Sequence, residues 1–278
     1  METDVALTTI PVNGFEMAFA EHGAGTALLL VHGSMGDYRW WSQQMEPFGE
    51  HYRTIAVSLR HCWPERWDGE GDDFTTQQHV EDIAAFIDTL NIGPVHLLGL
   101  SRGGHIAFRV ARYFPERVRT LVLVEPGGVL DASLEPSRTP ANPPLVLGSL
   151  FGEAAACIRR GEIDQGLAPV IDALTGPGGW ARSPELIKTI LRDNAYTLLG
   201  QIKEQRVPFS RKDAEEIRAP VLLMSGEYSP EIFQRILDGL QTALKDVRRV
   251  VIPGASHGSN FDNPRDFERE VLAFLKDR

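Results

Sequence analysis

The pentapeptide Gly99-Leu-Ser101-Arg-Gly103 lies between a short apolar run and a segment with helical spacing. A strand that turns sharply into a helix holds the middle residue of such a motif at the apex, often with strained backbone angles. Glycines on both sides prevent collisions with the neighbouring strand and helix. The motif therefore predicts that the Ser101 hydroxyl stands at the carboxyl edge of a sheet, with a helix N-terminus beneath it. A glycine-rich turn without chemistry is the alternative interpretation.

Composition and charge restrict the class of protein. The 278 residues, 42% of them hydrophobic and 24% charged, can bury the core of one large α/β domain or of one domain with an insertion. The formal net charge of −10 argues against nucleic acid or an anionic membrane as a partner, because both attract basic surfaces. We expect instead a small-molecule substrate and a monomer or homodimer.

The sequence also predicts a soluble, cytoplasmic protein without a cofactor. Residues 1–10 lack the basic start and long apolar core of a secretory signal, and no apolar run approaches the ~20 residues needed to cross a bilayer. Cys62 and Cys157 lie far apart, so we expect unpaired buried thiols rather than a disulfide or a metal site. Because no metal-ligand spacing and no nucleotide-binding loop occur, neither a metal nor another cofactor is implied.

Short apolar runs alternate with helical patterns along the chain. They predict a mostly parallel central sheet with helices on both faces, because strands this apolar must be covered on both sides. Asn13-Gly14 predicts a hairpin between the first two strands. The segments expected as strands are residues 5–12, 15–21, 27–31, 52–59, 95–100, 120–124, 221–224 and 249–252.

The alternation of strands and helices is interrupted after residue 126. No strand-like run occurs before residue 219, and helical patterns occupy residues 147–160, 163–174 and 184–202. We interpret residues 129–217 as a helical lid over the carboxyl edge of the sheet, and residues 1–128 and 218–278 as the α/β core. A surface excursion without functional weight is the alternative interpretation.

A histidine follows the last predicted strand. His257 lies in the glycine-containing loop of residues 253–264, downstream of Ser101 and before a C-terminal helical pattern. A histidine on such a loop can reach a serine at the edge of an earlier strand. A neutral imidazole can remove the serine proton and then return it to the leaving group. Of the eight histidines in the chain, His257 is therefore the candidate general base.

The loop after the strand at residues 27–31 is a candidate oxyanion site. It reads His-Gly-Ser-Met-Gly, and its glycines allow the backbone to turn its amides toward Ser101. The amides of Ser34 and Arg102 are expected to point at the developing negative oxygen. Met35 and Tyr38, next to this loop, are the candidate substrate-binding residues.

In chain order, His32-Gly33-x-x-Gly36, Gly99-x-Ser101-x-Gly103, the lid and Gly254-x-x-His257 resemble the α/β-hydrolase superfamily. The resemblance covers nearly the whole chain and implies the α/β-hydrolase fold. It does not imply one substrate, because the superfamily includes esterases, lactonases, carbon–carbon bond hydrolases, cofactor-free oxygenases and hormone receptors that keep a triad.

The chain departs from this family where most members carry the triad acid. They have an aspartate in a Gly-x-x-Asp pattern after the strand that follows the lid, and here that position is Ser229. A hydroxyl lacks the charge that stabilises an imidazolium. Glu125, which ends the predicted strand before the lid, is the candidate acid, because a minority of members, including some lactonases and cofactor-free quinolone dioxygenases, place it there. Glu227 is the alternative acid.

Three further basic residues have less specific roles. Arg60 is all that remains of a loop motif common in the family, and we expect it to pair with a carboxylate. The side chains of Arg102 and His105, beside Ser101, have two interpretations. They meet solvent or a local carboxylate, or they bind an acidic group of the substrate.

The sequence thus favours a serine hydrolase that cleaves a small carboxylic ester or lactone through an acyl-enzyme. Ser101 is the expected nucleophile, His257 the base and Glu125 the acid. Three alternatives stay open. They are a cofactor-independent oxygenase that uses the histidine and the acid, a carbon–carbon bond hydrolase, and a ligand-binding receptor with little turnover.

Overall fold

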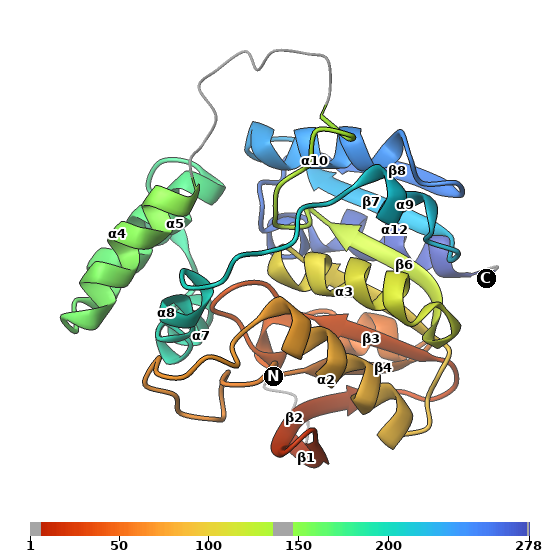
Figure 1. Ribbon diagram of the computed structural model, residues 1–278, viewed down its shortest axis with the longest axis horizontal. Helices are drawn as coiled ribbons and strands as arrows, with labels where there is room; N and C mark the ends of the chain where they lie inside the picture. The colour runs from red at the N-terminus through yellow and green to blue at the C-terminus, as the bar shows by residue number, and fades with distance from the viewer. Residues whose placement is uncertain (1–6, 136–146, 277) are drawn as a thin grey trace.

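A central sheet organises the protein (Figure 1). The computed structural model describes residues 7–135, 147–276 and 278, and eight strands of this part form the sheet. They are β1 (Leu7–Val12), β2 (Phe15–His22), β3 (Ala27–Val31), β4 (Arg53–Val57), β5 (Val95–Leu100), β6 (Val118–Val124), β7 (Val221–Gly226) and β8 (Val247–Ile252). The order is β1-β2-β4-β3-β5-β6-β7-β8, with β1 and β2 antiparallel to their neighbours and every pair from β4 to β8 parallel.

Helices cover both faces of the sheet, as the apolar strands predict. On one face lie α2 (Thr76–Thr89), α3 (Arg102–Tyr113) and α10 (Glu231–Gln241). The other face is covered by η1 (Tyr38–Trp41), α1 (Met45–Gly49) and α12 (Pro264–Leu275). Successive side chains of a strand point to opposite faces, so neighbouring leucines of β3 join different hydrophobic clusters. The predicted mostly parallel sheet, covered on both sides, is confirmed.

Local signals in the sequence place several boundaries. Asn13 and Gly14 both have positive φ angles, 45° and 83°, which a two-residue hairpin between β1 and β2 requires. The Thr75 hydroxyl accepts a hydrogen bond of 3.1 Å from the amide of Gln78 and so caps the start of α2. The predicted hairpin is therefore confirmed.

Arg60 is anchored beneath the first hairpin. Its guanidinium donates through Nε and Nη2 to the two carboxylate oxygens of Asp82, each at 3.0 Å, and lies 4.3 Å from the centre of the Phe15 ring. The Asp82 carboxylate is fully buried and also accepts hydrogen bonds from Asn13 and Gln78. The expectation that Arg60 pairs with a carboxylate is confirmed.

Replacement of Asp82 is expected to destabilise the fold strongly. In Asp82→Ala the guanidinium of Arg60 stays buried with no equally close carboxylate, because its other acidic neighbour, Asp73, is 3.5 Å away and partly exposed. Breaking a buried pair from one side costs about 3–5 kcal/mol of unfolding free energy. Urea unfolding followed by circular dichroism measures this loss.

Asp88, on the same helix, supplies the matched control. It pairs with Arg117 at 2.7 Å, but its side chain is 56% exposed. Exposed pairs contribute about 1 kcal/mol or less, so Asp88→Ala is expected to lower the unfolding free energy by no more than that. Equal losses of unfolding free energy in Asp82→Ala and Asp88→Ala would contradict the expectation that the buried pair of Arg60 and Asp82 matters more than an exposed one.

In the chain, a group of helices comes between β6 and β7. In space it is set apart from the sheet, at the left of Figure 1. Its members are α4 (Leu147–Arg159), α5 (Ile163–Thr175), α6 (Gly179–Arg182), α7 (Glu185–Asp193) and α8 (Thr197–Gln201). They have a hydrophobic cluster of their own, to which the core contributes Met35. We call residues 147–202 the cap. Residues 136–146 of the predicted lid lie outside the described residues.

The chain rejoins the core before the predicted lid ends. Phe209, Ala214 and Ile217 belong to the main hydrophobic cluster, and α9 (Arg211–Glu215) lies beside the core. Phe209 also forms a β-bridge with Leu130. The predicted lid, which ends at residue 217, therefore includes residues 209–217, and this stretch packs as part of the core.

The helix predicted over residues 184–202 is wrong in one respect, because it breaks at Asn194 into α7 and α8. The Asn194 side chain donates to Asp37 at 2.6 Å and accepts from the Trp63 amide at 2.7 Å. These bonds tie the cap to two loops of the core. An asparagine that bonds tertiary partners in this way ends a helix that hydrophobic spacing alone continues.

Two simpler expectations concern thiols and membranes. Cys62 and Cys157 are both free, as expected, and Cys62 is buried; the expected burial of Cys157 is wrong, because it is partly exposed on the cap. No helix in the described part of the chain is long and apolar enough to span a membrane.

Candidate active site

Ser101 lies at the sharp turn between β5 and α3. Its backbone angles, φ 53° and ψ −116°, are those of a strained turn that a serine seldom adopts. The turn is held by its own amide, which donates to the Val124 carbonyl at 2.9 Å, and by its carbonyl, which accepts from Gly127 at 2.7 Å. A Cβ at Gly99 or Gly103 would collide with backbone oxygens, so both positions require glycine. The predicted geometry of the motif is confirmed.

Glu125 meets His257 at the adjoining strand end. Glu125 directly follows β6, has a positive φ of 44° and is completely buried. Its Oε2 forms a hydrogen bond with His257 Nδ1. Its Oε1 accepts a hydrogen bond of 2.8 Å from the Gly226 amide at the end of β7. The carboxylate is therefore fixed from two sides and aimed at the imidazole.

The alternative acid is placed differently. Glu227 is exposed, and its Oε2 accepts a hydrogen bond of 2.8 Å from the Gly254 amide. The Ser229 hydroxyl accepts from the Gly226 amide at 3.1 Å. Neither side chain forms a hydrogen bond with His257 within the described residues. Of the acids considered from the sequence, the structure brings Glu125 to the histidine.

His257 is held between Glu125 and an aromatic ring. The Phe233 ring of α10 stacks on the imidazole, with ring centres 4.1 Å apart and an angle of 15° between planes. His257 and Ser101 line the same cavity, and no hydrogen bond joins them in the described part of the chain. Bonds of this kind are often long in unliganded enzymes and tighten with substrate. No signal in the sequence pointed to Phe233, because it is one apolar residue on the buried face of α10.

The loop after β3 passes beside Ser101. A Cβ built on Gly33 would lie 3.3 Å from the Ser101 Cβ, and Ser34 lines the same cavity. Arg102 is the first residue of α3, where amides have no partner inside the helix. Within the described residues, the amides of Ser34 and Arg102 donate no hydrogen bond to another protein group. Both are thus available to an oxyanion, and that role stays a prediction.

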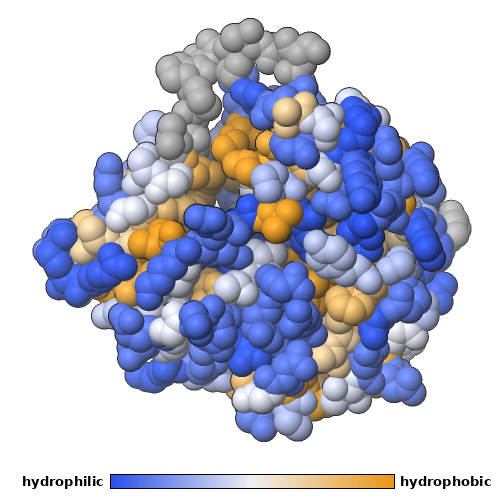
Figure 2. Space-filling model, viewed as in Figure 1, coloured by the Kyte–Doolittle hydropathy of each residue, from blue (hydrophilic) through white to orange (hydrophobic). Residues whose placement is uncertain are grey.

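A cavity of about 560 Å³ joins these groups between core and cap. Most of its wall is hydrophobic, and Figure 2 shows hydrophobic side chains gathered on this face between the cap and the core. Met35 lines the cavity, as predicted. Tyr38 does not line it, because its side chain packs against the hydrophobic cluster under η1. Trp40, two residues further along, lines the cavity instead. The expectation for Tyr38 is therefore corrected.

The side chains beside Ser101 do not enter the cavity either. The Arg102 guanidinium is buried over the Phe74 ring and donates to Glu204 at 2.7 Å. His105 is buried, with Nδ1 2.8 Å from the Gly127 carbonyl oxygen. Burial, followed by the charges of Arg206 and Arg109, lowers the pKa of His105 to about 3, so it is neutral at physiological pH. The Arg102 side chain therefore pairs with a local carboxylate, which was one of its two interpretations from the sequence.

Two charged residues on the cavity wall were missed from the sequence. Glu204 and Arg206 follow the last cap helix and line the same cavity as Ser101. The nearby sequence is short, polar and without periodicity, so it carries no signal that separates them from other surface charges. Only the return of the chain from the cap to the core places them there.

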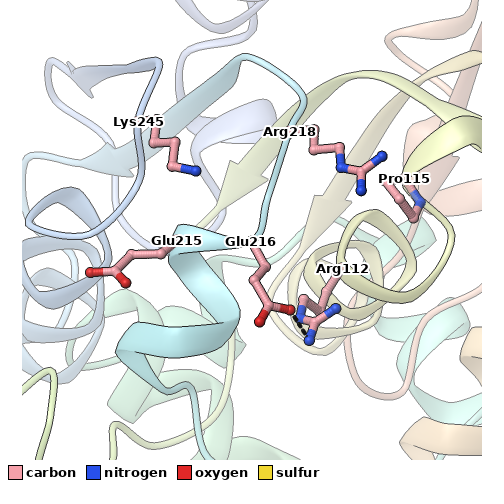
Figure 3. A pocket seen from close by; sticks show the side chains of 6 residues that line it. All are labelled: Arg112, Pro115, Glu215, Glu216, Arg218 and Lys245. Carbon is pink, nitrogen blue, oxygen red and sulfur yellow. Dashed lines mark ion pairs between the residues drawn. The ribbon is translucent and has the colours of Figure 1, made fainter.

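A second hollow, of about 290 Å³, lies away from these residues (Figure 3). Its lining is Arg112, Pro115, Glu215, Glu216, Arg218 and Lys245. Figure 3 shows Arg112 and Glu216 paired with each other. The hollow has no serine, histidine or cysteine in its lining, so it offers neither a hydroxyl or thiol nucleophile nor an imidazole base. The cavity beside Ser101 is the candidate active site.

The described residues contain no group of three or more histidine, cysteine or acidic side chains arranged to hold a metal ion. The chemistry that this cavity offers comes from its serine, its histidine–glutamate pair and its two free amides.

Comparison with known proteins gives a consistent result. The model of the alpha/beta hydrolase fold family matches residues 26–264. A 2-hydroxy-6-oxo-6-phenylhexa-2,4-dienoate hydrolase of Burkholderia cepacia is 26% identical over an alignment of 284 positions. The alignment covers 95% of this chain and 92% of that protein.

Solved structures resemble the whole chain. The enol-lactonase of Burkholderia xenovorans LB400 has a TM-score of 0.78 and 20% identity, covering 97% of this chain and 100% of that one. A thermophilic esterase from Thermogutta terrifontis has a TM-score of 0.77 and 22% identity, covering 98% of each chain. At these identities the likeness concerns the fold.

Proposed function

The chain belongs to the α/β-hydrolase family, and from that membership we propose that it is a serine hydrolase acting on a small carboxylic ester or lactone. One observation carries the proposal. The buried carboxylate of Glu125 holds Nδ1 of His257, and this histidine shares a cavity with a serine at a strained turn. A nucleophile, a base and an acid that orients the base are the parts that acyl transfer requires.

In the proposed reaction the Ser101 hydroxyl attacks the carbonyl carbon, and its proton passes to Nε2 of His257. Glu125 keeps the proton of the imidazole on Nδ1 and stabilises the imidazolium that forms. The amides of Ser34 and Arg102 donate to the oxyanion, and each donor of this kind is worth about 3–4 kcal/mol in the transition state. His257 then protonates the leaving group, and a water that it activates releases the acyl group.

The size and the lining of the cavity favour a small organic substrate. A volume of about 560 Å³ with a mainly hydrophobic lining suits a ligand of modest size, oriented by a few polar groups. The esterase and the enol-lactonase with similar folds are consistent with ester or lactone cleavage.

Carbon–carbon bond hydrolysis is the second candidate function. The Burkholderia cepacia relative, similar over 95% of this chain, is named as a hydrolase of a 6-oxo-dienoate. Substrate panels containing aryl esters, lactones and vinylogous 1,5-diketones separate the two candidates by the product released.

The first test is labelling of the purified protein with a fluorophosphonate probe. We expect a covalent adduct on Ser101, located by peptide mass spectrometry, because an activated serine beside oxyanion donors attacks phosphorus. Ser101→Ala and heat-denatured protein serve as controls and should remain unlabelled. If folded protein carries no adduct on Ser101, the serine hydrolase proposal is wrong.

A further inference from the structure

The wall of the active-site cavity carries an unusual charge. The carboxylate and guanidinium groups in its described lining belong to Glu204 and Arg206. The rest is hydrophobic or neutral, with aromatic and aliphatic side chains from both cap and core. A charged group in such a wall is expensive unless it is paired or meets a ligand, so the partners of these two residues matter.

Both oxygens of the Glu204 carboxylate have hydrogen-bond partners in the protein. One carboxylate oxygen accepts from the Thr76 amide, and the other accepts from Arg102 Nη1 at 2.7 Å and from Arg206 Nε at 3.2 Å. Burial acts to raise the pKa of this carboxyl. The charge of Arg102, hydrogen bonding from Thr76 and the charge of Arg206 outweigh burial and lower the pKa to about 2. Glu204 is therefore one negative charge shared by two guanidinium groups.

Arg206 is left with unused donors. Its Nε–H bonds to Glu204, while its two Nη groups make no hydrogen bond within the described residues. The side chain is 18% exposed, and it lines the cavity. A guanidinium has five N–H donors arranged as a fork that matches a carboxylate.

The surrounding groups do not neutralise the excess charge. Arg102 and Arg206 share one carboxylate, which leaves one net positive charge. Burial and the charge of Arg102 lower the pKa of His79, beside Arg102, well below its usual range, so it is neutral. Arg109, behind His105, has its own partner in Asp213 at 2.6 Å. A monoanion placed at Arg206 would balance the cluster.

Given the serine hydrolase proposed above, we propose that Arg206 binds a carboxylate of the substrate, so that the preferred esters or lactones carry an acid group remote from the reacting carbonyl. The single net charge and the hydrophobic remainder of the wall favour a carboxylate over a phosphate dianion. Arg102 and Glu204 act as positioning residues, because Glu204 holds Arg206 through Nε and leaves both Nη groups for the ligand.

The test compares two activated esters of similar length. The probes are mono-4-nitrophenyl glutarate, which carries a free carboxylate, and 4-nitrophenyl hexanoate, which is neutral. Because the free carboxylate also cleaves its own ester intramolecularly, rates are corrected with Ser101→Ala protein. The quantity measured is the ratio of kcat/KM for the anionic ester to that for the neutral ester.

We expect a ratio well above one for the unaltered protein and a fall of roughly 10–100-fold in Arg206→Gln, the range typical of a lost charge-assisted hydrogen bond. Arg206→Lys keeps the charge but not the fork, so its ratio should fall between the two. Arg218→Gln removes the same charge from the hollow of Figure 3, outside the cavity, and should leave the ratio unchanged.

The outcomes separate this inference from the proposed function. Hydrolysis of both esters, with the same ratio in the unaltered protein and Arg206→Gln, overturns the carboxylate site and leaves the serine hydrolase standing. Absence of Ser101-dependent hydrolysis and of fluorophosphonate labelling overturns the proposed function itself. A second measurement uses the unaltered protein. Glutarate should slow fluorophosphonate labelling of Ser101, and glutaramide should not. Equal effects of the two compounds contradict the carboxylate site.

Discussion

Glu125→Gln is expected to lower kcat about 10⁴-fold with little change in KM, the scale found when a triad acid is replaced by its amide. The reason lies in the two bonds of the carboxylate. One oxygen accepts from Gly226 at 2.8 Å and the other faces His257 Nδ1. A glutamine can satisfy one of these donors but presents its NH₂ group to the other.

Either orientation of that amide is harmful. With its NH₂ toward His257, the imidazole must accept at Nδ1 and carry its proton on Nε2, where it cannot take a proton from Ser101. With its NH₂ toward Gly226, two donors face each other in a buried site. Steady-state kinetics on an activated ester, with unfolding curves to confirm the fold, measure the effect.

Glu227→Gln is the matched control. This glutamate is exposed and contacts the Gly254 amide rather than the histidine. Its replacement should change kcat by less than about tenfold, because the transition state gains nothing directly from its charge. If Glu227→Gln proves the more damaging variant, the assignment of the acid is wrong.

Ser101→Ala is expected to lower kcat by about 10⁶-fold, the scale seen for loss of a hydrolase nucleophile. Residual catalysis over water should persist, because the oxyanion amides and the cavity remain. The backbone at this position has φ 53°, and alanine and serine both carry a Cβ and meet the same strain there, so the fold should lose little stability relative to the parent. Single-turnover assays give the remaining rate.

The same variant tests a different chemistry. An enzyme that uses His257 and Glu125 to deprotonate a substrate for reaction with oxygen needs the dyad more than the serine. Oxygen uptake that survives Ser101→Ala, on any substrate of the parent protein, would contradict acyl transfer. A ligand that raises the melting temperature without yielding product would instead support the receptor alternative.

The sequence predicted the sheet and placed the three candidate residues at its carboxyl edge, because turns and strand ends follow local rules. The turn at Ser101 needs glycines at fixed offsets, and the end of a parallel strand places its next residue at a known edge. The choice of Glu125 over Glu227 also needed the resemblance to the minority of family members that place the acid after this strand. The adjacency of β6 and β7 places Glu125 beside Gly226, and the loop after β8, the next strand of the sheet, brings His257 to its other oxygen.

The wall of the cavity could not be predicted in the same way. Arg206 and Glu204 stand where the chain returns from the cap, and their roles depend on Arg102, about a hundred residues earlier in the chain. The Tyr38 error has a similar cause. A 3-10 turn starting at Asp37 directs Trp40 rather than Tyr38 to the cavity, and spacing in the sequence does not reveal that turn.

The glutamate after β6 also affects how proteins of this kind are recognised in genomes. A motif search that demands an aspartate after β7 would class this chain as a degenerate copy that has lost its chemistry, since Ser229 stands there. A search written on the glutamate after β6 and the histidine after β8 would recover it. The turn after β7 then has to keep only the Gly226 amide, which holds Glu125, so the side chains between that glycine and α10 are released from catalytic constraint.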